Sequence, residues 1–456
     1  MNETVSDTMS NSGYADEKEL AGLYPAHVQT LKKRFDRALE KAGASHAVIF
    51  SGAPKLVFLD DNYYPFRANP HFVHWLPLTK VPFCYLLYTP GEKPVLLYFQ
   101  PKDYWHSAPA TPDEFWTDHF DIKVVHELAE INTHLPKNRD HCVLLGDIED
   151  NGHAFGIDRI NPTTVLHMLH YARGVKTPYE LECMRIASHC GVLGHRAAEK
   201  AFRDGLSEYE IHLAYCRAVS HTENELPYGN IIALNEHSAV MHYQHQARDV
   251  PGEIRSFLID AGASFNGFAS DITRSWSYTS SEFRDLIQRM DQLQQEIVSE
   301  VKAGVDFPAL HLLTHRKIAE VLIELDFASG SVEALIESDV TAAFFPTGLG
   351  HLLGIQVHDV GGFMADENGN TIDRPSGHPY LRLTRELESN MVLTIEPGLY
   401  VIDMLLDNLV GTPGHEMVNQ DRVDWLRPFG GIRIEDNVRV LEDGCENFTR
   451  AAFASL

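Results

Sequence analysis

The segment 256–276 constrains the fold of this chain more than any other, because it predicts a tight β-hairpin that contains two aspartates. Two runs rich in apolar residues flank the dipeptide Asn266-Gly267, which two-residue hairpin turns favour because both residues tolerate positive φ. Asp260 lies within the first run and Asp271 within the second. A largely apolar hairpin can retain two carboxylates only where water or a compensating charge reaches them.

The expected register of the hairpin brings these carboxylates together. With the turn centred on Asn266-Gly267, Asp260 lies opposite Thr273, and Asp271 is two residues from Thr273 along the second strand. Both aspartates then emerge from one face at diagonal-neighbour distance. Adjacent anions repel unless a proton or a cation lies between them, and hard divalent ions prefer carboxylate oxygens. The alternative is a polar pair at the solvent edge of the hairpin, which these two residues alone do not exclude.

Three further segments place ionisable side chains within apolar, strand-like runs. They are His351 and His358 in segment 347–362, Glu396 in segment 391–400, and Arg433 and Glu435 in segment 431–440. Gly348 and Gly350 allow the backbone before His351 to approach another segment closely. Strand alternation places Arg433 and Glu435 on one face. Taken singly, each of these groups is better explained as a buried charge that a neighbour satisfies.

Taken together, the four carboxylates and one histidine indicate a metal site. Burying them in apolar runs would carry a severe desolvation cost without compensating cations. Oxygen-rich ligands with a single imidazole suit a pair of divalent ions of the Mn or Co type better than a lone structural zinc. Two such ions about 3.5–4 Å apart would share the carboxylates and hold a hydroxide between them. The Gly-x-Gly at Gly348 lacks the strand-to-helix context of a dinucleotide-binding loop.

Length and composition limit the remaining classes of function. At 456 residues the chain exceeds the size of a single hydrophobic core, so two domains are expected. A net charge of −26 without a concentrated basic segment argues against nucleic acid as the partner. No apolar run approaches the roughly 18–20 residues that span a bilayer, so no membrane partner is expected. The six cysteines are scattered without a C-x-x-C pair, which indicates reduced thiols in a cytoplasmic protein.

The pattern of helices and strands divides the chain near residue 175. Its predicted parts are a disordered tail at 1–16, an N-terminal α/β domain at 17–174 and an α+β domain at 175–456. The tail lacks the basic start and apolar stretch of a signal peptide. An amphipathic helix opens the first domain and ends near Gly43. Thr177, Pro178 and Glu180 form a capping box that opens a long helix in the second domain.

The order Asp260, Asp271, His351, Glu396 and Glu435 resembles the ligand set of a known family. These residues lie in LIDAGASFNGFASDITR, GLGHLLGIQVHDVGG, TIEPGLY and GIRIEDN. All five match the pita-bread dinuclear metallopeptidases, which include methionine aminopeptidase, aminopeptidase P and prolidase, over roughly residue 176 to the C-terminus. The resemblance implies a creatinase-like N-terminal α/β domain followed by an α+β pita-bread catalytic domain.

Within this family the chain is similar to the bacterial prolidases, which are Xaa-Pro dipeptidases, and in particular to their organophosphorus acid anhydrolase group. The similarity rests on LPYGNI with Tyr228, on HPYLRLTRELESNMVLTIEPG and on the long connection 402–430. It implies two Mn(II) ions per subunit, with Co(II) or Zn(II) as alternatives. A metal-bridging hydroxide would attack the carbonyl carbon before proline in an Xaa-Pro dipeptide, and Glu396 would shuttle its proton. A phosphoryl centre would meet the same hydroxide, so hydrolysis of organophosphorus esters or fluorides is an expected side activity.

The resemblance also implies substrate-site roles for residues outside the ligand set. His242 and His358 would line the pocket and stabilise the tetrahedral oxyanion or hold the substrate, although both could instead be satisfied structural histidines. Arg382 would bind the proline carboxylate with its guanidinium fork, which would favour dipeptides over longer chains. Tyr228 would line the substrate pocket. Arg433 would support the metal carboxylates beside the substrate.

The resemblance extends to assembly and leaves alternatives open. The loop near Asp61 in the first domain would help to close the site of the other subunit in a homodimer or a dimer of dimers. One alternative is an aminopeptidase P that accepts longer Xaa-Pro-Xaa peptides. Another is a non-catalytic pita-bread module that binds partners, although such modules lose the metal ligands that this chain retains. Creatinase, the metal-free relative, lacks the ligand set as well.

Overall fold

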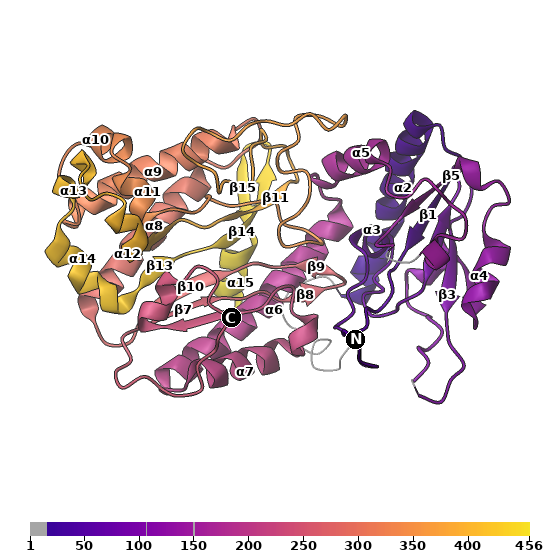
Figure 1. Cartoon of the computed structure of the whole chain (residues 1–456), viewed down its shortest axis with the longest axis horizontal. Coiled ribbons are helices and arrows are strands. Elements are labelled where there is room, and N and C mark those ends of the chain that lie inside the picture. The colour runs from indigo at the N-terminus through magenta and orange to yellow at the C-terminus, as the bar shows by residue number, and fades with distance from the viewer. Residues whose placement is uncertain (1–15, 106, 149–150) are drawn as a thin grey trace.

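The computed structural model describes residues 16–105, 107–148 and 151–456. Two domains lie side by side along the long axis of the molecule, the N-terminal one in indigo to purple and the second in magenta to yellow (Figure 1). The predicted tail comprises residues 1–16, and of these residues 1–15 lie outside the described residues. Asp16 already belongs to the fold, because it is the N-cap of the first described helix.

The N-terminal domain is a mixed five-stranded sheet with helices on both faces. Its strands, in the spatial order β4-β3-β2-β1-β5, are β1 (His46–Phe50), β2 (Tyr85–Tyr88), β3 (Val95–Phe99), β4 (Asp121–Val125) and β5 (Cys142–Leu145). Its helices are α2 (Glu17–Ala42), α3 (Pro70–Trp75), α4 (Leu128–His134) and α5 (Thr163–Arg173). Helix α2 lies between the sheet and the second domain, and α4 covers the outer face (Figure 1). Four of the strands are therefore mostly buried and read as apolar runs, whereas the edge strand β4 exposes Asp121 and Lys123.

Helix α2 begins and ends where the sequence predicts. Asp16 and Glu19 form a capping box at its start, and Gly43 ends it in the left-handed conformation with φ 60°. One apolar stripe faces the domain core and consists of Leu20, Tyr24, Val28, Leu31, Phe35 and Leu39. Because these residues recur at helical spacing, the hydrophobic stripe alone sets the orientation of the helix.

The second domain begins with the predicted capping box. Thr177 is the N-cap of α6 (Pro178–Arg203), and Glu180 completes the box. The same turn contacts the first domain: His27 Nδ1 lies 2.8 Å from Thr177 Oγ1, and His74 Nε2 lies 3.0 Å from Glu180 Oε1. All four side chains are buried. These contacts hold the N-terminal domain against the start of α6.

The second domain is built from short sheets with two groups of helices outside them. Its strands are β6 (Ile231–Leu234), β7 (Ser256–Asp260), β8 (Ser264–Phe265), β9 (Phe268–Ala269), β10 (Thr273–Ser277), β11 (Val392–Ile395), β12 (Gly398–Tyr400), β13 (Gly431–Arg433), β14 (Asp436–Leu441) and β15 (Gly444–Asn447). They form the sheets β10-β7-β6, β11-β14-β15, β12-β13 and β8-β9. The predicted α/β domain followed by an α+β domain is confirmed.

The helices pack on two separate hydrophobic cores. Besides α6 they are α7 (Glu208–Val219), α8 (Ser281–Ser299), α9 (Phe307–Glu324), α10 (Val332–Glu337), α11 (Val340–Phe344), α12 (Asp403–Asp407), α13 (Pro413–Met417), α14 (Gln420–Leu426) and α15 (Phe448–Ser455). Helices α6 and α7 share one core with β7, while α8 and α9 share the other with β11, β13 and β14. The strand ends between the two cores are the part of the domain where polar side chains gather.

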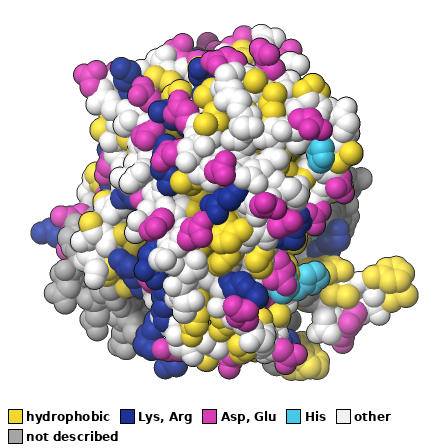
Figure 2. Space-filling model, turned by 90° about the vertical axis from the view of Figure 1, so that its left-hand side faces the viewer, with side chains coloured by type: hydrophobic (Ala, Val, Ile, Leu, Met, Phe, Trp, Pro, Cys, Tyr) yellow, Lys and Arg dark blue, Asp and Glu magenta, His cyan; other side chains and the backbone are white. Residues whose placement is uncertain are grey.

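The surface carries charged side chains of both signs. On the face that Figure 2 shows, acidic side chains are interspersed with basic and hydrophobic ones. No helix among the described residues combines the length and the apolar character that crossing a bilayer requires. All six cysteines lie within the described residues and are free.

Candidate metal centre

The hairpin has the predicted register. Asn266 and Gly267 adopt φ 50° and φ 87° at the turn, and Thr273 pairs with Asp260. The hairpin is interrupted, however: β7 ends at Asp260, and β8 and β9 form a separate short pair around the turn. At the break the two backbones approach closely, since a Cβ on Gly262 would lie 1.9 Å from the carbonyl oxygen of Ser270. Asp260 is therefore the last residue of β7, and Asp271 lies in the irregular segment between β9 and β10.

The two aspartates of the hairpin point to one spot. The Tyr228 hydroxyl lies 2.8 Å from Asp260 Oδ1 and 2.5 Å from Asp271 Oδ1. One phenol oxygen within reach of both carboxylates requires that their oxygens face each other. This arrangement excludes the alternative of two solvent-edge carboxylates, because the side chains of Asp260 and Asp271 are only 15% and 7% exposed.

The segment 431–440 adds Glu435 and Arg433 to the same spot. Glu435 forms a β-bridge with Thr273 and accepts a hydrogen bond from its hydroxyl at 2.7 Å. Arg433 donates to Thr273 Oγ1 at 3.1 Å and to Asp260 Oδ2 at 2.7 Å. Both side chains therefore lie on the face that strand alternation predicts. Arg433 supplies a fixed positive charge beside a cluster of carboxylates.

The segment around His351 is fastened to β11. His351 N donates to Thr394 Oγ1 at 3.1 Å, and Thr394 N donates to the His351 carbonyl at 3.0 Å. This pairing requires Gly350, because a Cβ there would lie 2.0 Å from the Thr394 carbonyl oxygen. Two residues beyond Thr394, Glu396 directly follows the strand. The predicted close approach of the glycine-rich segment is thus to the strand that leads to Glu396.

The imidazole of His351 lies among the carboxylates. Its Nδ1 lies 3.0 Å from the Leu352 carbonyl, which favours a proton on Nδ1 and leaves Nε2 free to accept or to ligate. Nε2 lies 3.4 Å from Asp271 Oδ2 and 3.6 Å from Glu396 Oε1. One ligand atom each from Asp271, His351 and Glu435 lies within 4.8 Å of the others. Such mutual distances are those of donors that could share an ion.

The electrostatics of the cluster show the cost of packing four carboxylates together. Burial, followed by the neighbouring carboxylates, raises the pKa of Glu396 to about 7 and raises the pKa of Glu435 well above its usual value. Burial would lower the pKa of His351, but Asp271 and Glu396 raise it. Protonation is one way to relieve this repulsion, and bound cations are the other. The donor set of carboxylate oxygens with one imidazole fits a pair of divalent ions.

A cleft of about 1170 Å³ opens onto the cluster. Asp260, Asp271 and Tyr228 line it from the second domain, together with His242 and His358. The rings of His351 and His358 lie edge to face with centroids 4.4 Å apart. Burial lowers the pKa of His358 to about 4, and His351 adds to the shift. His358 is therefore neutral near pH 7.

The remaining predicted residues lie farther from the carboxylates. Arg382 is exposed, and its charge contributes to the lowered pKa of His358, but it is not among the described residues that line the cleft. Asp61 is exposed on a loop of the first domain and likewise does not line the cleft within its own chain. Its predicted role concerns another subunit and stays a prediction.

One residue that lines the cleft, Arg67, was not predicted from the sequence. Arg67 comes from the N-terminal domain and donates to the carbonyls of Pro227 and Leu226, both at 2.8 Å. It thereby holds the loop that carries Tyr228. Its only sequence signal is its place in an aromatic-rich loop, which could have indicated a surface loop just as well.

Comparisons with known proteins agree with this geometry. Residues 22–171 match the family described as Xaa-Pro dipeptidase, N-terminal domain, and residues 182–442 match metallopeptidase family M24. The chain is 48% identical over 433 residues to the Xaa-Pro dipeptidase of Shewanella pealeana, covering 95% of this chain and 98% of the relative. It is also 48% identical over 440 residues to that of Xanthomonas euvesicatoria, covering 96% and 99%.

Solved structures agree on the fold. Pseudomonas aeruginosa aminopeptidase PepP superposes with a TM-score of 0.72 at 22% identity, covering 96% of each chain. Proline aminopeptidase P II from Yersinia pestis gives a TM-score of 0.70 at 23% identity, covering 95% of this chain and 96% of that one. The predicted creatinase-like and pita-bread architecture is thereby confirmed. The chain belongs to metallopeptidase family M24, among the bacterial Xaa-Pro dipeptidases.

Proposed function

We propose that this protein is a metal-dependent dipeptidase that hydrolyses Xaa-Pro dipeptides. The observation that carries the proposal is the convergence of one imidazole and four carboxylates from separate segments, with Asp260 and Asp271 lining the cleft. Relatives that are called Xaa-Pro dipeptidases and match almost the whole chain support the choice of substrate. The substrate would enter the cleft between the two domains, where residues of both line the wall.

Two Mn(II) ions per subunit are the cofactors we propose, with Co(II) or Zn(II) as alternatives. Asp260, Asp271 and Glu435 would bridge or clamp both ions, and His351 and Glu396 would ligate one of the two. When bound, a pair of such ions acts as a Lewis acid and lowers the pKa of water to about 7. Arg433 would keep the Asp260 carboxylate oriented, because the two groups lie 2.7 Å apart.

Glu396 would move the proton in the reaction. Its Oε1 lies 3.6 Å from His351 Nε2, so its carboxylate stands beside the place proposed for the ions. A carboxylate at this position can accept a proton as the carbonyl carbon is attacked and return it to the departing proline nitrogen. That nitrogen carries no hydrogen in an Xaa-Pro bond, so a proton donor is required.

Side chains around the cluster would bind and orient the substrate. A neutral His358, together with His242, would donate to the oxyanion that develops on the carbonyl oxygen. Tyr228 would contact the substrate beside the aspartates. Arg382 would bind the proline carboxylate, which would favour dipeptides, because a longer peptide has an amide at that position.

An aminopeptidase P activity on longer peptides is the second candidate. The likeness to aminopeptidases P is one of fold alone at 22–23% identity. Comparing the hydrolysis of an Xaa-Pro dipeptide with that of the corresponding Xaa-Pro-Xaa tripeptide, in protein loaded with Mn(II), distinguishes the two. We expect the dipeptide to be preferred, and a clear preference for the tripeptide would reject the dipeptidase.

Three further properties belong to the same proposal. Organophosphorus esters and fluorides would be side substrates, since a phosphoryl oxygen can be polarised in the same way as a carbonyl. A non-catalytic binding module is disfavoured because the full ligand set is present. We also infer a cytoplasmic protein from its free cysteines. We further propose that the protein forms a homodimer or a dimer of dimers, in which Asp61 approaches the cleft of the partner subunit.

A further inference from the structure

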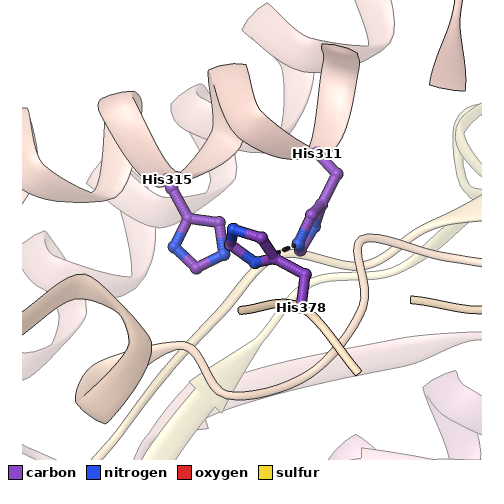
Figure 3. A group of neighbouring side chains, drawn as sticks. All are labelled: His311, His315 and His378. Carbon is purple, nitrogen blue, oxygen red and sulfur yellow. Dashed lines mark hydrogen bonds between the residues drawn. The ribbon is translucent and has the colours of Figure 1, made fainter. Parts of the chain in front are cut away.

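Three histidines form a cluster in the second domain that shares no residue with the carboxylate cluster. His311 and His315 lie one turn apart on α9, and His378 approaches them from a loop (Figure 3). The ring centroid of His311 lies 4.8 Å from that of His315 and 4.6 Å from that of His378. The centroids of His315 and His378 are 4.7 Å apart. Spacing of i and i+4 on a helix turns both side chains to one face.

The hydrogen bonds of this cluster are incomplete. His311 Nε2 lies 2.9 Å from His378 Nδ1, and His315 Nδ1 lies 3.1 Å from Thr341 Oγ1. His315 Nε2 and His311 Nδ1 are buried without a hydrogen-bond partner. His311 and His315 are 1% and 2% exposed, so water does not replace the missing partners. A buried polar atom of this kind is costly unless a ligand completes its interactions, and an ion bound to His315 Nε2 would do so for that nitrogen.

The three rings are in the chemical form that binds metals. Burial lowers the pKa of His311 to about 2 and that of His315 to about 3, and the neighbouring imidazoles add to both shifts. Burial also lowers the pKa of His378, although Asp339 opposes this shift. All three rings are therefore neutral near pH 7, and neutral imidazole is the form that ligates a metal ion. Imidazole ligands suit zinc, copper and nickel, whereas the carboxylate cluster suits manganese.

We propose that His311, His315 and His378 bind one Zn²⁺-type divalent transition-metal ion, at a site distinct from the carboxylate cluster. One ligand atom from each ring already lies within 4.8 Å of the others. Three imidazoles leave the fourth tetrahedral position to water. Because His378 is partly exposed, that position lies on the solvent side of the cluster.

Two of the three ligand atoms need only a small movement to admit the ion. Two nitrogens on a tetrahedral zinc are about 3.4 Å apart, given bonds of about 2.1 Å. His311 Nε2 and His378 Nδ1 are now 2.9 Å apart, so their separation has to grow by about 0.5 Å. His378 can supply this movement because it lies on a loop, whereas His311 and His315 are fixed on α9.

The ion would join this loop to the helix. His378 precedes Arg382 by four residues, so zinc would also restrict the segment that carries Arg382. This consequence rests on the proposed function, in which Arg382 binds the proline carboxylate. The metal site itself does not depend on that role.

Zinc content provides the test. The full-length protein is stripped with a chelator and dialysed against excess Zn²⁺, and bound zinc is then counted per chain. The variants are His378→Gln and His315→Gln, and the matched control is His415→Gln, which changes an exposed histidine on α13. We expect the wild type and the control to hold one more zinc ion per chain than His378→Gln. Equal zinc content in the wild type and His378→Gln would overturn the proposal.

A second readout separates this site from the carboxylate cluster. Tetrahedral Co²⁺ on imidazoles absorbs visible light more strongly than Co²⁺ in five- or six-coordinate oxygen sites. A Co²⁺ titration of the wild type should show this absorption, and His378→Gln should bind that ion at least about tenfold more weakly. An identical titration for the two proteins would refute the site. Because neither readout is dipeptidase activity, failure of the proposed function would leave both tests intact.

Discussion

Replacing Gly350 with alanine should separate His351 from Glu396 without unfolding the protein. The added Cβ would lie 2.0 Å from the carbonyl oxygen of Thr394. Carbon and carbonyl oxygen in contact are about 3.3 Å apart, so one of the two segments has to move by about 1.3 Å. The neighbouring atom is backbone in a buried strand, so the segment that carries His351 is the one expected to shift.

The size of this shift sets the expected loss. A displacement of about 1 Å at reacting groups lowers the rate about 100-fold, which corresponds to about 2.7 kcal/mol of transition-state stabilisation. Overpacking of this kind costs about 1–3 kcal/mol of folding free energy, which is less than the stability of a typical domain. Gly350→Ala should therefore fold and lose about two orders of magnitude in kcat/KM.

The assay is hydrolysis of an Xaa-Pro dipeptide with saturating Mn(II), alongside circular dichroism and metal content. Gly252→Ala is the matched control, because a Cβ at Gly252 meets nothing within 4 Å and its φ is not in the left-handed region. The control should retain wild-type kcat/KM. A folded Gly350→Ala protein with wild-type kcat/KM would show that the contact with Thr394 does not set the geometry of the site.

Three other substitutions test separate parts of the site. Asp271→Ala should abolish turnover while the fold survives, because relief of carboxylate repulsion offsets lost metal stabilisation; an active variant would remove Asp271 from the ligand set. Arg382→Ala should raise KM for Xaa-Pro dipeptides, and an unchanged KM would exclude the carboxylate role. Asp359→Asn should lower the free energy of unfolding at pH 7 by about 3–5 kcal/mol in urea titrations, because Arg173 and Lys176 lose their buried partner. Burial opposes but these two cations lower the pKa of Asp359, so its stabilisation is complete above its unfolded pKa of about 3.9 and disappears as pH falls below it. A difference between the two proteins that did not begin to shrink as the pH fell below about 3.9 would contradict that assignment.

The sequence sufficed wherever a local pattern determines a local structure. Asn266-Gly267 fixes the turn, the turn fixes the pairing of Asp260 with Thr273, and Thr177 with Glu180 fixes the start of α6. In each case the interaction spans a few residues, so spacing alone predicts it. The resemblance to M24 peptidases then supplied the order of the distant residues.

Contacts between distant segments could not be predicted in this way. Thr394 holds the His351 segment by two hydrogen bonds, yet neither residue carries a signal for the other. Arg67 reaches the loop of Tyr228 from another domain. No sequence pattern predicts the contact of His378 with α9 either, because only the path of the intervening chain brings this single loop histidine to the helix.

Metal content and dipeptide hydrolysis, followed together, test the proposed site most directly. The protein is first stripped with a chelator, and Mn(II) is then added stepwise while bound metal and Xaa-Pro turnover are measured in the same samples. We expect the stripped protein to be inactive and turnover to reach its maximum at two Mn(II) ions per chain. Full turnover in protein without bound metal would contradict a metal-dependent dipeptidase built on Asp260, Asp271, His351, Glu396 and Glu435.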